Sequence, residues 1–569
     1  MVKLSKLVSL IVLSMSLSSV ANAAWQPAKE VECKRKTIDS SITMNDVTMM
    51  KSSNTRSACF GSDNPVCDLR FYDIYVPAFV HDDSGAPGVE KNWSPSTVKG
   101  NIKGILNNLA YIKGVGVNAI ILSPIFKTVS NEFQAEEHLK HDGTGSYVSN
   151  YFEIDPRFGT LDELKELVDR AHRMGLKVVF DIALGKVKNN ISVFSPNDNR
   201  LILNQNCRSI KGYFDKTTVT GTSCINSERS VDYLKDVVSY WINELKIDGY
   251  RFIDAYQIET KVWKELREAI KAESAKETNM YKQGSKSVNP LGLTIADMVT
   301  DQPKDIESNA FSSNSVEMAM NYPAKNAILR VLASDGDSFS KKSCSQPTRI
   351  FNDDMYAKMA GYSRKGIPVN FISSANGIRF GDLLQRAKYE KDGDLDASYY
   401  NAHKAALVFL TSMSGPISLM YGDEIGSELE DFVSSPSNCD RTNQCDDHVS
   451  RTSGKINGFS DFEQDLKQHV FKYLKLRDEH LSLSRGERIH VFSDESLYLD
   501  IKQYKKDRVL VILNSSEKAR KVSFEPSLWK ALKYESCGLI DLDDYKKVSK
   551  SSLEIPSVST KMYRLDCIK

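Results

Sequence analysis

The chain has 569 residues, too many for one hydrophobic core, so we expect two or three domains. Hydrophobic residues make up 41% of it and charged residues 26%, with a formal net charge of +1, as in an ordinary soluble globular protein. This balance gives no support to binding of nucleic acid or of a membrane surface. Beyond the extreme N-terminus, no apolar run is long enough to span a bilayer.

Residues 1–23 have the pattern of a secretory signal peptide. Lys3 and Lys6 precede an apolar stretch, residues 7–20, which is followed by the small-residue sequence ANAA. The alternative, a membrane anchor, is less favoured because the stretch is shorter than the roughly 20 residues that a spanning helix needs. We therefore expect cleavage after Ala23 and a secreted or periplasmic protein, with no membrane association after cleavage.

From residue 70 onward, short apolar runs alternate with amphipathic helical patterns. The runs that we interpret as strands are FYDIYVPAF (71–79), VNAIILSPIF (117–126), LKVVFDIAL (176–184), IDGYRFID (247–254), LGLTIADM (291–298), VEMAMNY (316–322), IPVNFIS (367–373) and ISLMYGDE (417–424). Helical patterns cover residues 102–114, 161–175, 230–245, 260–275 and 399–413. Eight continuously hydrophobic strands that alternate with helices predict the α/β class and a closed (β/α)8 TIM barrel.

Two segments depart from this alternation. Residues 185–229 follow the third strand, are polar and contain two cysteines, and we predict an inserted subdomain there. After about residue 487 the pattern changes to alternating strands without helices, at 496–504, 507–516 and 519–526. The predicted domains are therefore an N-terminal extension, a barrel and a C-terminal antiparallel β domain, at 24–69, 70–487 and 488–569.

Ten cysteines fit export to an oxidising compartment. The short-range candidates for disulfides are Cys59 with Cys67, Cys207 with Cys224, and Cys439 with Cys445. Spacing alone does not establish these pairings. A metal site is not indicated, because the sequence has no C-x-x-C motif.

Several stretches of the barrel have distinctive sequences: NLAYIKGVGVNAIILSPIF, YFEIDPRFGTLDELKELVDRAHRMGLKVVFDI, IDGYRFIDAYQI, YGDEIG and the later DDHVSRTSGKI. Their order and spacing resemble those of the α-amylase family, glycoside hydrolase family 13, over most of the mature chain. The resemblance implies a barrel with an insertion after its third strand and a C-terminal β domain. It also implies α-glucans or maltooligosaccharides as ligands. Family members retain configuration, which requires a carboxylate nucleophile and a carboxylic acid roughly 5–5.5 Å apart.

The fourth strand departs from the family at the nucleophile. Members read G-x-R-x-D, whereas this chain has Arg251 followed two residues later by Ile253. An isoleucine cannot form a glycosyl-enzyme ester. Asp254 is three residues from Arg251, so on a strand it faces the other side unless a bulge re-aims it. We expect the nucleophile to be missing, with Asp254 as a fallback.

The other catalytic positions also differ. The resemblance places Asp297 at the general acid, which is normally a glutamate and is one methylene longer. In the seventh strand, FISSANGIRF, the family's histidine and third acid become Ala375 and Asn376. Because nearly every catalytic position is replaced in a well-matched scaffold, we assign no catalytic residue and expect catalysis to be impaired or lost.

The resemblance still implies substrate contacts for Arg251, Tyr147, Tyr256 and Arg379. Without its acidic neighbour, Arg251 is expected to pair with another buried acid such as Asp181. The family's stacking tyrosine becomes Ser146. The asparagine that helps to hold calcium, and the histidine after it, become Gly185 and Lys186, so we expect this calcium site to be absent or weak and predict no cofactor. Asp423 and Glu424, in YGDEIG, are expected to be structural.

Three functions are compatible with this pattern. The first is a secreted α-amylase homologue that binds α-glucan, or assists active amylases, with little or no catalysis. The second is a retaining glycosidase that uses relocated acids, Asp254 and Asp297. The third is a scaffold for a protein partner. Aromatic residues at strand ends distinguish the first from the third, because a sugar-binding cleft needs them, and Tyr147, Tyr151 and Tyr256 are available.

Overall fold

The structure is a computed structural model that describes residues 42–44, 57–89, 94–128, 148–188, 222–224, 227–300, 302–311, 315–333, 345–360, 362, 365–388, 395–430 and 449–567. The predicted signal peptide and most of the predicted inserted subdomain lie outside the described residues. So do the predicted disulfides Cys207–Cys224 and Cys439–Cys445, since no side chain is described for these four cysteines.

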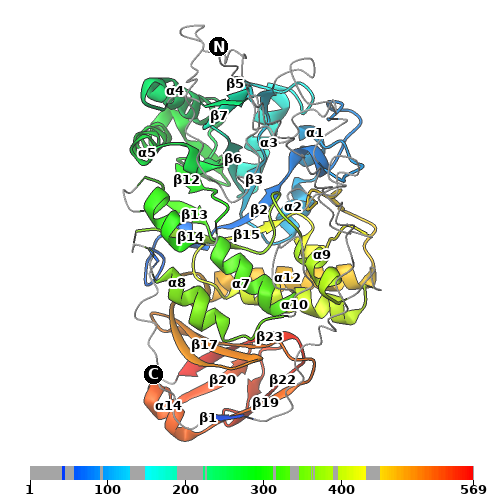
Figure 1. Cartoon of the computed structure of the whole chain (residues 1–569), viewed down its shortest axis with the longest axis vertical. Coiled ribbons are helices and arrows are strands. Elements are labelled where there is room, and N and C mark those ends of the chain that lie inside the picture. The colour runs from blue at the N-terminus through cyan, green and yellow to red at the C-terminus, as the bar shows by residue number, and fades with distance from the viewer. Residues whose placement is uncertain are drawn as a thin grey trace, which may run out of the picture. The chain divides into compact units, whose positions relative to one another are not determined.

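Eight parallel strands close into a barrel in the spatial order β12-β13-β14-β15-β2-β3-β6-β9 (Figure 1). In chain order they are β2 (Arg70–Ile74), β3 (Ala119–Leu122), β6 (Lys177–Ile182), β9 (Gly249–Phe252), β12 (Leu293–Ala296), β13 (Met318–Met320), β14 (Ile367–Phe371) and β15 (Ile417–Met420). Each neighbouring pair is parallel. The predicted (β/α)8 barrel is confirmed, with strands shorter than the apolar runs that predicted them.

Helices connect the strands, and α3, α4 and α5 lie outside the barrel in Figure 1. The longer ones are α3 (Leu161–Arg173), α4 (Ser227–Leu245), α5 (Thr260–Ser274), α7 (Tyr322–Leu332), α9 (Phe380–Lys388), α10 (Ala397–Thr411) and α12 (Asp461–Glu479). Short helices are α1 (Ile102–Asn107), α2 (Leu109–Gly114), α6 (Pro303–Ile306), α8 (Ala357–Met359) and α13 (Ser482–Arg485). The helix predicted at 102–114 is two helices, because Asn108 between them leaves the helical conformation with ψ at 16°.

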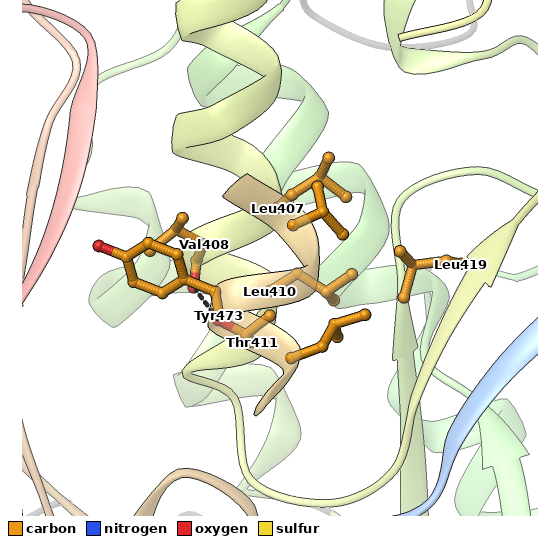
Figure 2. A pocket seen from close by; sticks show the side chains of 8 residues that line it. Leu407, Val408, Leu410, Thr411, Leu419 and Tyr473 are labelled. Atoms are coloured by element: carbon orange, nitrogen blue, oxygen red, sulfur yellow. Dashed lines mark hydrogen bonds between the residues drawn. The ribbon is translucent and has the colours of Figure 1, made fainter. Parts of the chain in front are cut away.

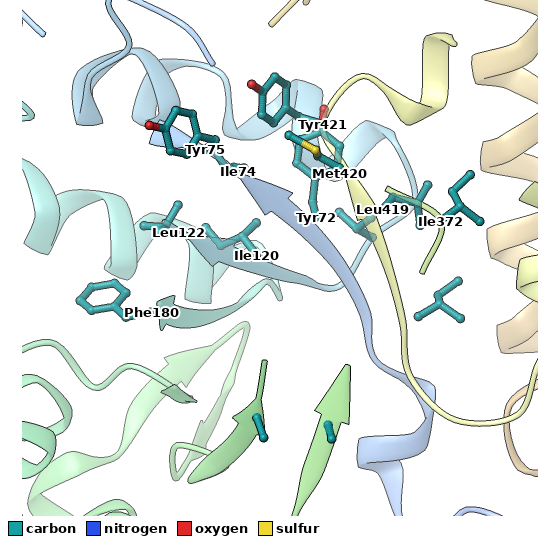
Figure 3. Close-up of a cluster of buried hydrophobic side chains, with 14 of the residues drawn as sticks. Tyr72, Ile74, Tyr75, Ile120, Leu122, Phe180, Ile372, Leu419, Met420 and Tyr421 are labelled. Atoms are coloured by element: carbon teal, nitrogen blue, oxygen red, sulfur yellow. The ribbon is translucent and has the colours of Figure 1, made fainter. Parts of the chain in front are cut away.

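The barrel strands separate two apolar layers. Outward-facing side chains such as Tyr72, Ile120 and Phe180 pack under the helices, and Figure 3 shows part of this layer. Inward-facing side chains fill the barrel itself, and Cys59 and Cys67 belong to this second cluster. Their predicted disulfide is confirmed. Because it precedes β2, it lies at the amino ends of the strands and leaves the carboxyl ends, where barrel enzymes place their chemistry, for other residues.

The C-terminal part contains a six-stranded sheet of order β16-β17-β18-β23-β20-β21 and a second sheet, β1-β19-β22. The strands are β16 (Glu487–Ser493), β17 (Leu497–Tyr504), β18 (Asp507–Asn514), β19 (Arg520–Phe524), β20 (Cys537–Asp541), β21 (Lys547–Val548), β22 (Ser552–Ile555) and β23 (Ser559–Cys567). The expectation of strands alone is wrong, because α14 (Pro526–Leu532) interrupts them; Pro526 occupies its first turn, where a missing N–H costs nothing.

Two features of this part were not predicted. Cys537 and Cys567 form a disulfide between paired strands. The strand β1 (Ile42–Met44), from the N-terminal extension, pairs in parallel with β19.

Small antiparallel pairs complete the fold: β4 (Phe126–Thr128) with β5 (Val148–Ile154), β7 (Lys186–Lys188) with β8 (Thr222–Cys224), and β10 (Tyr281–Gln283) with β11 (Lys286–Val288). Among the described helices, none is both long and apolar enough to cross a membrane.

Candidate functional site

Arg251 and two aspartates form a buried ionic cluster inside the barrel. Arg251 lies directly opposite Asp181 in the β6–β9 register, and its side chain is 4% exposed. Its Nε and Nη2 donate to the two carboxylate oxygens of Asp181 at 2.6 and 2.7 Å, and Nη1 and Nη2 donate to those of Asp73 at 2.5 and 2.9 Å. The predicted pairing with Asp181 is confirmed. The contact with Asp73 was missed because 178 residues separate the partners.

This cluster determines what Arg251 can do. Burial raises the pKa of Asp181 to about 7, although the Arg251 guanidinium favours the charged carboxylate. One cation therefore faces two carboxylates, and Asp181 keeps its proton to higher pH than an exposed aspartate does. Four of the five guanidinium N–H groups are engaged by protein carboxylates. The arrangement indicates a structural role for Arg251, and its predicted substrate contact stays a prediction.

The fourth strand ends earlier than the sequence pattern implies. β9 stops at Phe252, and Ile253 and Asp254 lie in the turn that follows. Asp254 adopts a left-handed conformation, with φ 51° and ψ 44°, which aspartate tolerates better than most residues. Strand alternation therefore does not extend to Asp254 and does not determine the direction of its side chain. Both residues are half-buried at the carboxyl end of the barrel.

Asp254 is held by residues of the same turn. Its carboxylate accepts a 3.4 Å hydrogen bond from the Tyr256 hydroxyl and a 3.3 Å bond from Gln257 Nε2. Its charge also contributes to the raised pKa of Asp297, after the larger effect of burial. The turn thus brings the fallback acid into the electrostatic environment of the residue at the general-acid position. Tyr256, a predicted sugar contact, is half-buried beside them.

Asp297 follows directly after β12 and is 5% exposed. Its Oδ1 accepts a 2.8 Å hydrogen bond from the Tyr322 hydroxyl, and its backbone N–H donates to Phe252 O at 2.9 Å. Burial raises the pKa of Asp297, while Arg251 and the Tyr322 hydrogen bond oppose the rise. A carboxyl group that keeps its proton to higher pH has the property required of a general acid. Tyr322 was not identified from the sequence.

Asn376, at the position of the third acid, is bound by an arginine from a distant loop. Arg451 Nη2 donates to Asn376 Oδ1 at 2.8 Å, and its Nε donates to Ala375 O at 2.7 Å. The guanidinium carbon lies 4.9 Å from the centre of the Tyr75 ring, a cation–π contact. Both positions that the family uses to grip sugar therefore contact Arg451. This residue lies in DDHVSRTSGKI, and no sequence pattern predicts its contact with a residue 75 positions away.

Two of the predicted sugar contacts are buried instead. Arg379 is 1% exposed; its Nε donates to Thr452 Oγ1 at 3.2 Å and its Nη1 lies 3.6 Å from Asp423 Oδ1. These contacts indicate a structural role for Arg379, and its predicted substrate contact stays a prediction. Tyr151 is fully buried and its hydroxyl donates to Ala183 O at 2.6 Å, so it offers no stacking surface. Tyr147 lies outside the described residues.

Asp423 and Glu424, in η8 (Asp423–Ile425), have the structural role expected of them. Glu424 Oε1 accepts hydrogen bonds from Tyr72 and Tyr111 at 2.7 and 2.6 Å. Burial raises the pKa of Asp423 to about 7, against the opposing charge of Arg379.

The residues at the family's calcium position do not fit the ion. Gly185 offers no side-chain oxygen, and a Cβ built on it would lie 2.4 Å from both Cβ and Oε1 of Gln257. The space that an asparagine would need there is filled by Gln257. Calcium requires six to eight oxygen ligands. Because residue 185 is glycine, its side chain contributes none of them. In the part of the chain that the structure describes, no three His, Cys, Asp or Glu side chains are grouped to hold a metal.

A hollow elsewhere in the barrel domain is not a ligand site. It lies between α10 and α12 beneath β15, and Figure 2 shows the side chains around it, including Leu407, Leu410, Leu419 and Tyr473. The lining is almost entirely apolar and the gap is too narrow to admit a water molecule. It is a packing gap in the helical layer, and the acids described above remain the candidate site.

Comparison with known proteins shows which family and fold this chain resembles. The family model described as alpha amylase, catalytic domain, matches residues 73–223. The cyclomaltodextrinase of Thermoanaerobacter pseudethanolicus is 24% identical over 474 residues, which cover 79% of this chain and 71% of the relative. Neopullulanase 2 of Thermoactinomyces vulgaris is 24% identical over 491 residues, covering 81% and 71% respectively.

Solved structures extend the similarity. The crystal structure of AmyP in complex with maltose has a TM-score of 0.78 and 31% sequence identity, covering 88% of this chain and 97% of AmyP. A variant of AmyP in complex with maltotriose gives the same TM-score and identity. The α-amylase of Geobacillus thermoleovorans, solved with acarbose, has a TM-score of 0.68 at 20% identity and shows the likeness of fold alone.

Proposed function

This chain belongs to the α-amylase family, glycoside hydrolase family 13, and we propose that it binds α-glucans or maltooligosaccharides with little or no hydrolysis. The single observation that carries the second half of this proposal is Ile253. It follows Arg251 by two residues, the position of the family's nucleophile, and its side chain is a hydrocarbon. Retention of configuration requires a carboxylate there to form the glycosyl ester.

Two further observations support weak catalysis. Arg251, which in the family neighbours the nucleophile, here engages Asp73 and Asp181. Asn376 replaces the third acid and is hydrogen-bonded to Arg451. Each group that would stabilise charge at the reacting carbon is thus absent or committed to another partner. Because catalytic groups act as a unit, the combined loss exceeds that of any one residue.

Binding of α-glucan is supported by the relatives. AmyP is 31% identical and has been solved with maltose and, as a variant, with maltotriose. Cyclomaltodextrinases and a neopullulanase are more distant relatives. We propose further that the protein is secreted or periplasmic. This rests on the N-terminal sequence pattern, and the disulfides Cys59–Cys67 and Cys537–Cys567 are compatible with an oxidising compartment.

One observation favours a second candidate, a glycosidase with relocated acids. The turn after β9 places Asp254 where its charge acts on Asp297. In this scheme the Asp254 carboxylate attacks the anomeric carbon while Asp297 gives its proton to the leaving oxygen. Asp297 suits the acid because burial raises its pKa. Asp254 is hydrogen-bonded within its own turn, which limits its approach to a sugar.

Calorimetric titration with maltotriose, together with reducing-end assays on starch and maltotriose, separates the candidates. We expect heat of binding with no turnover above background. Turnover that is abolished by Asp254→Asn and Asp297→Asn, but kept in the exposed control Asp232→Asn, would establish the second candidate instead. Absence of both binding and turnover would refute both candidates.

A further inference from the structure

Two strands of the C-terminal sheet carry a serine, a histidine and an aspartate on one face. In the antiparallel pair β16–β17, His490 lies opposite Asp500, and Ser493 lies opposite Tyr498. On a regular strand, His490 and Ser493 would point to opposite faces because they are three residues apart. The register shifts between His490 and Phe492, and this bulge brings Ser493 onto the face of His490.

The three side chains are joined by hydrogen bonds in sequence. His490 Nδ1 lies 2.9 Å from Asp500 Oδ1, and Ser493 Oγ lies 3.2 Å from His490 Nε2. When Nδ1 carries the proton and donates it to the carboxylate, Nε2 presents a lone pair to the serine hydroxyl. This is the tautomer that a general base needs, and the order serine, histidine, aspartate is that of an activated nucleophile.

Asp500 is placed to orient the imidazole. It is 3% exposed and also accepts hydrogen bonds from Arg488 Nε and the Tyr498 hydroxyl. Burial alone would raise the pKa of Asp500, but Arg488 and His490 hold it below its usual value. A charged, fixed carboxylate keeps the proton on Nδ1 and stabilises the imidazolium that forms when Nε2 accepts a second proton.

Exposure to solvent increases from Asp500 through His490 to Ser493, as a reactive centre requires. Asp500 is buried and His490 is 8% exposed, whereas Ser493 is half-buried and borders solvent. β16 is the edge strand of its sheet, so backbone N–H groups on its outer side are not used by a neighbouring strand. Such groups are the usual donors to the oxyanion of an acyl-transfer reaction.

We propose that Ser493, His490 and Asp500 form a second reactive centre, in which Ser493 is a nucleophile toward carboxylic esters. Ser493 Oγ bonds to the ester carbonyl carbon as its proton passes to His490 Nε2. The C–O bond to the alcohol breaks, the alcohol takes that proton, and an acyl-serine remains. Water then attacks the acyl carbon, its proton passes through Nε2 to Oγ, and the carboxylic acid leaves. No cofactor or oxidant is needed, and the centre is independent of the barrel acids.

A fluorophosphonate probe tests the proposal on the full-length protein. Ser493 Oγ would bond to phosphorus with loss of fluoride, and peptide mass spectrometry would locate the adduct. We expect Ser493 to be labelled, the label to vanish in Ser493→Ala, and p-nitrophenyl acetate hydrolysis to fall with it. In His490→Gln, which can still donate to Asp500 but supplies no base, the labelling rate should fall by about 100-fold, a typical general-base contribution.

The matched control is Ser549, an exposed serine of the same domain whose hydroxyl contacts Ser551 and not an imidazole. It should remain unlabelled, and Ser549→Ala should label at Ser493 as fast as the unmodified protein. Melting temperatures of all variants establish that they are folded. Wild-type protein that is unlabelled at Ser493 overturns the proposal. So does a folded His490→Gln variant that is labelled at an unchanged rate, because labelling would then not depend on the imidazole.

Discussion

Replacing Arg251 with methionine tests whether this residue supports the fold or contacts the sugar. The substitution removes four N–H···O contacts to Asp73 and Asp181 and leaves two carboxylates inside the barrel, where each is almost fully buried. Removing one partner of a buried ion pair costs about 3–5 kcal/mol, because the remaining charge is uncompensated. We therefore expect Arg251→Met to lower the free energy of unfolding by that amount.

The measurement is urea unfolding followed by circular dichroism at pH 7.5, above the pKa of about 7 to which burial raises Asp181. Arg173→Met is the matched control, because Arg173 forms an exposed ion pair with Asp169 one helical turn away and should cost at most about 1 kcal/mol. The triple variant Arg251→Met, Asp73→Asn, Asp181→Asn should recover part of the loss, since no charge is left buried. Loss of maltotriose binding by Arg251→Met at unchanged stability would refute the structural role.

Three other predictions concern Ile253, Arg477 and Asp423. Ile253→Asp alone should restore no starch hydrolysis, because an ångström of misplacement at the acid costs about 100-fold in rate; measurable activity is expected only when it is combined with Asp297→Glu, Ala375→His and Asn376→Asp. Arg477→Met should destabilise by about 3 kcal/mol in urea unfolding. The fully buried Arg477 donates to the carbonyls of Thr411, Met413 and Gly415, at the end of α10 and just beyond it, and each would lose its partner at about 1 kcal/mol. Asp423 has a folded-state pKa of about 7, above its unfolded value, so its protonation stabilises the fold at low pH and this stability is lost as pH rises toward 7. Asp423→Asn should flatten the fall in unfolding free energy between pH 5 and 7 by up to roughly 1.4 kcal/mol per pH unit, and an unchanged slope would contradict the assignment.

The features that the sequence predicts well depend on local pattern. Continuous apolar runs place all eight barrel strands, because both faces of a parallel barrel strand are buried and no polar alternation blurs the signal. The short separation of 8 residues made Cys59–Cys67 a candidate disulfide, and the structure contains it. The pairing of Arg251 with Asp181 follows from register, since neighbouring parallel strands place inward-facing residues side by side.

The features that it does not predict depend on where strands end and on distant contacts. Apolar character continues through Ile253, yet β9 ends at Phe252, so strand alternation does not extend to Asp254. The contact of Arg451 with Asn376 joins a loop to a strand end 75 residues away. Neither segment has a sequence pattern that implies this contact. The seven-residue α14 is shorter than two helical turns, too short for periodicity to show.

The buried cluster of Arg251, Asp73 and Asp181 explains how the residue at position 253 can change without destabilising the fold. If an acid at position 253 were needed to neutralise the charge of Arg251, then Ile253 would leave Arg251 as an unpaired buried cation. Its charge is instead met by Asp73 on β2 and Asp181 on β6, and the three side chains link neighbouring regions of the barrel wall. Ile253 lies beyond the end of β9, half-buried, and no buried charge depends on it. Selection for the barrel therefore places no requirement on an acid at this position, and only selection for hydrolysis would keep one there.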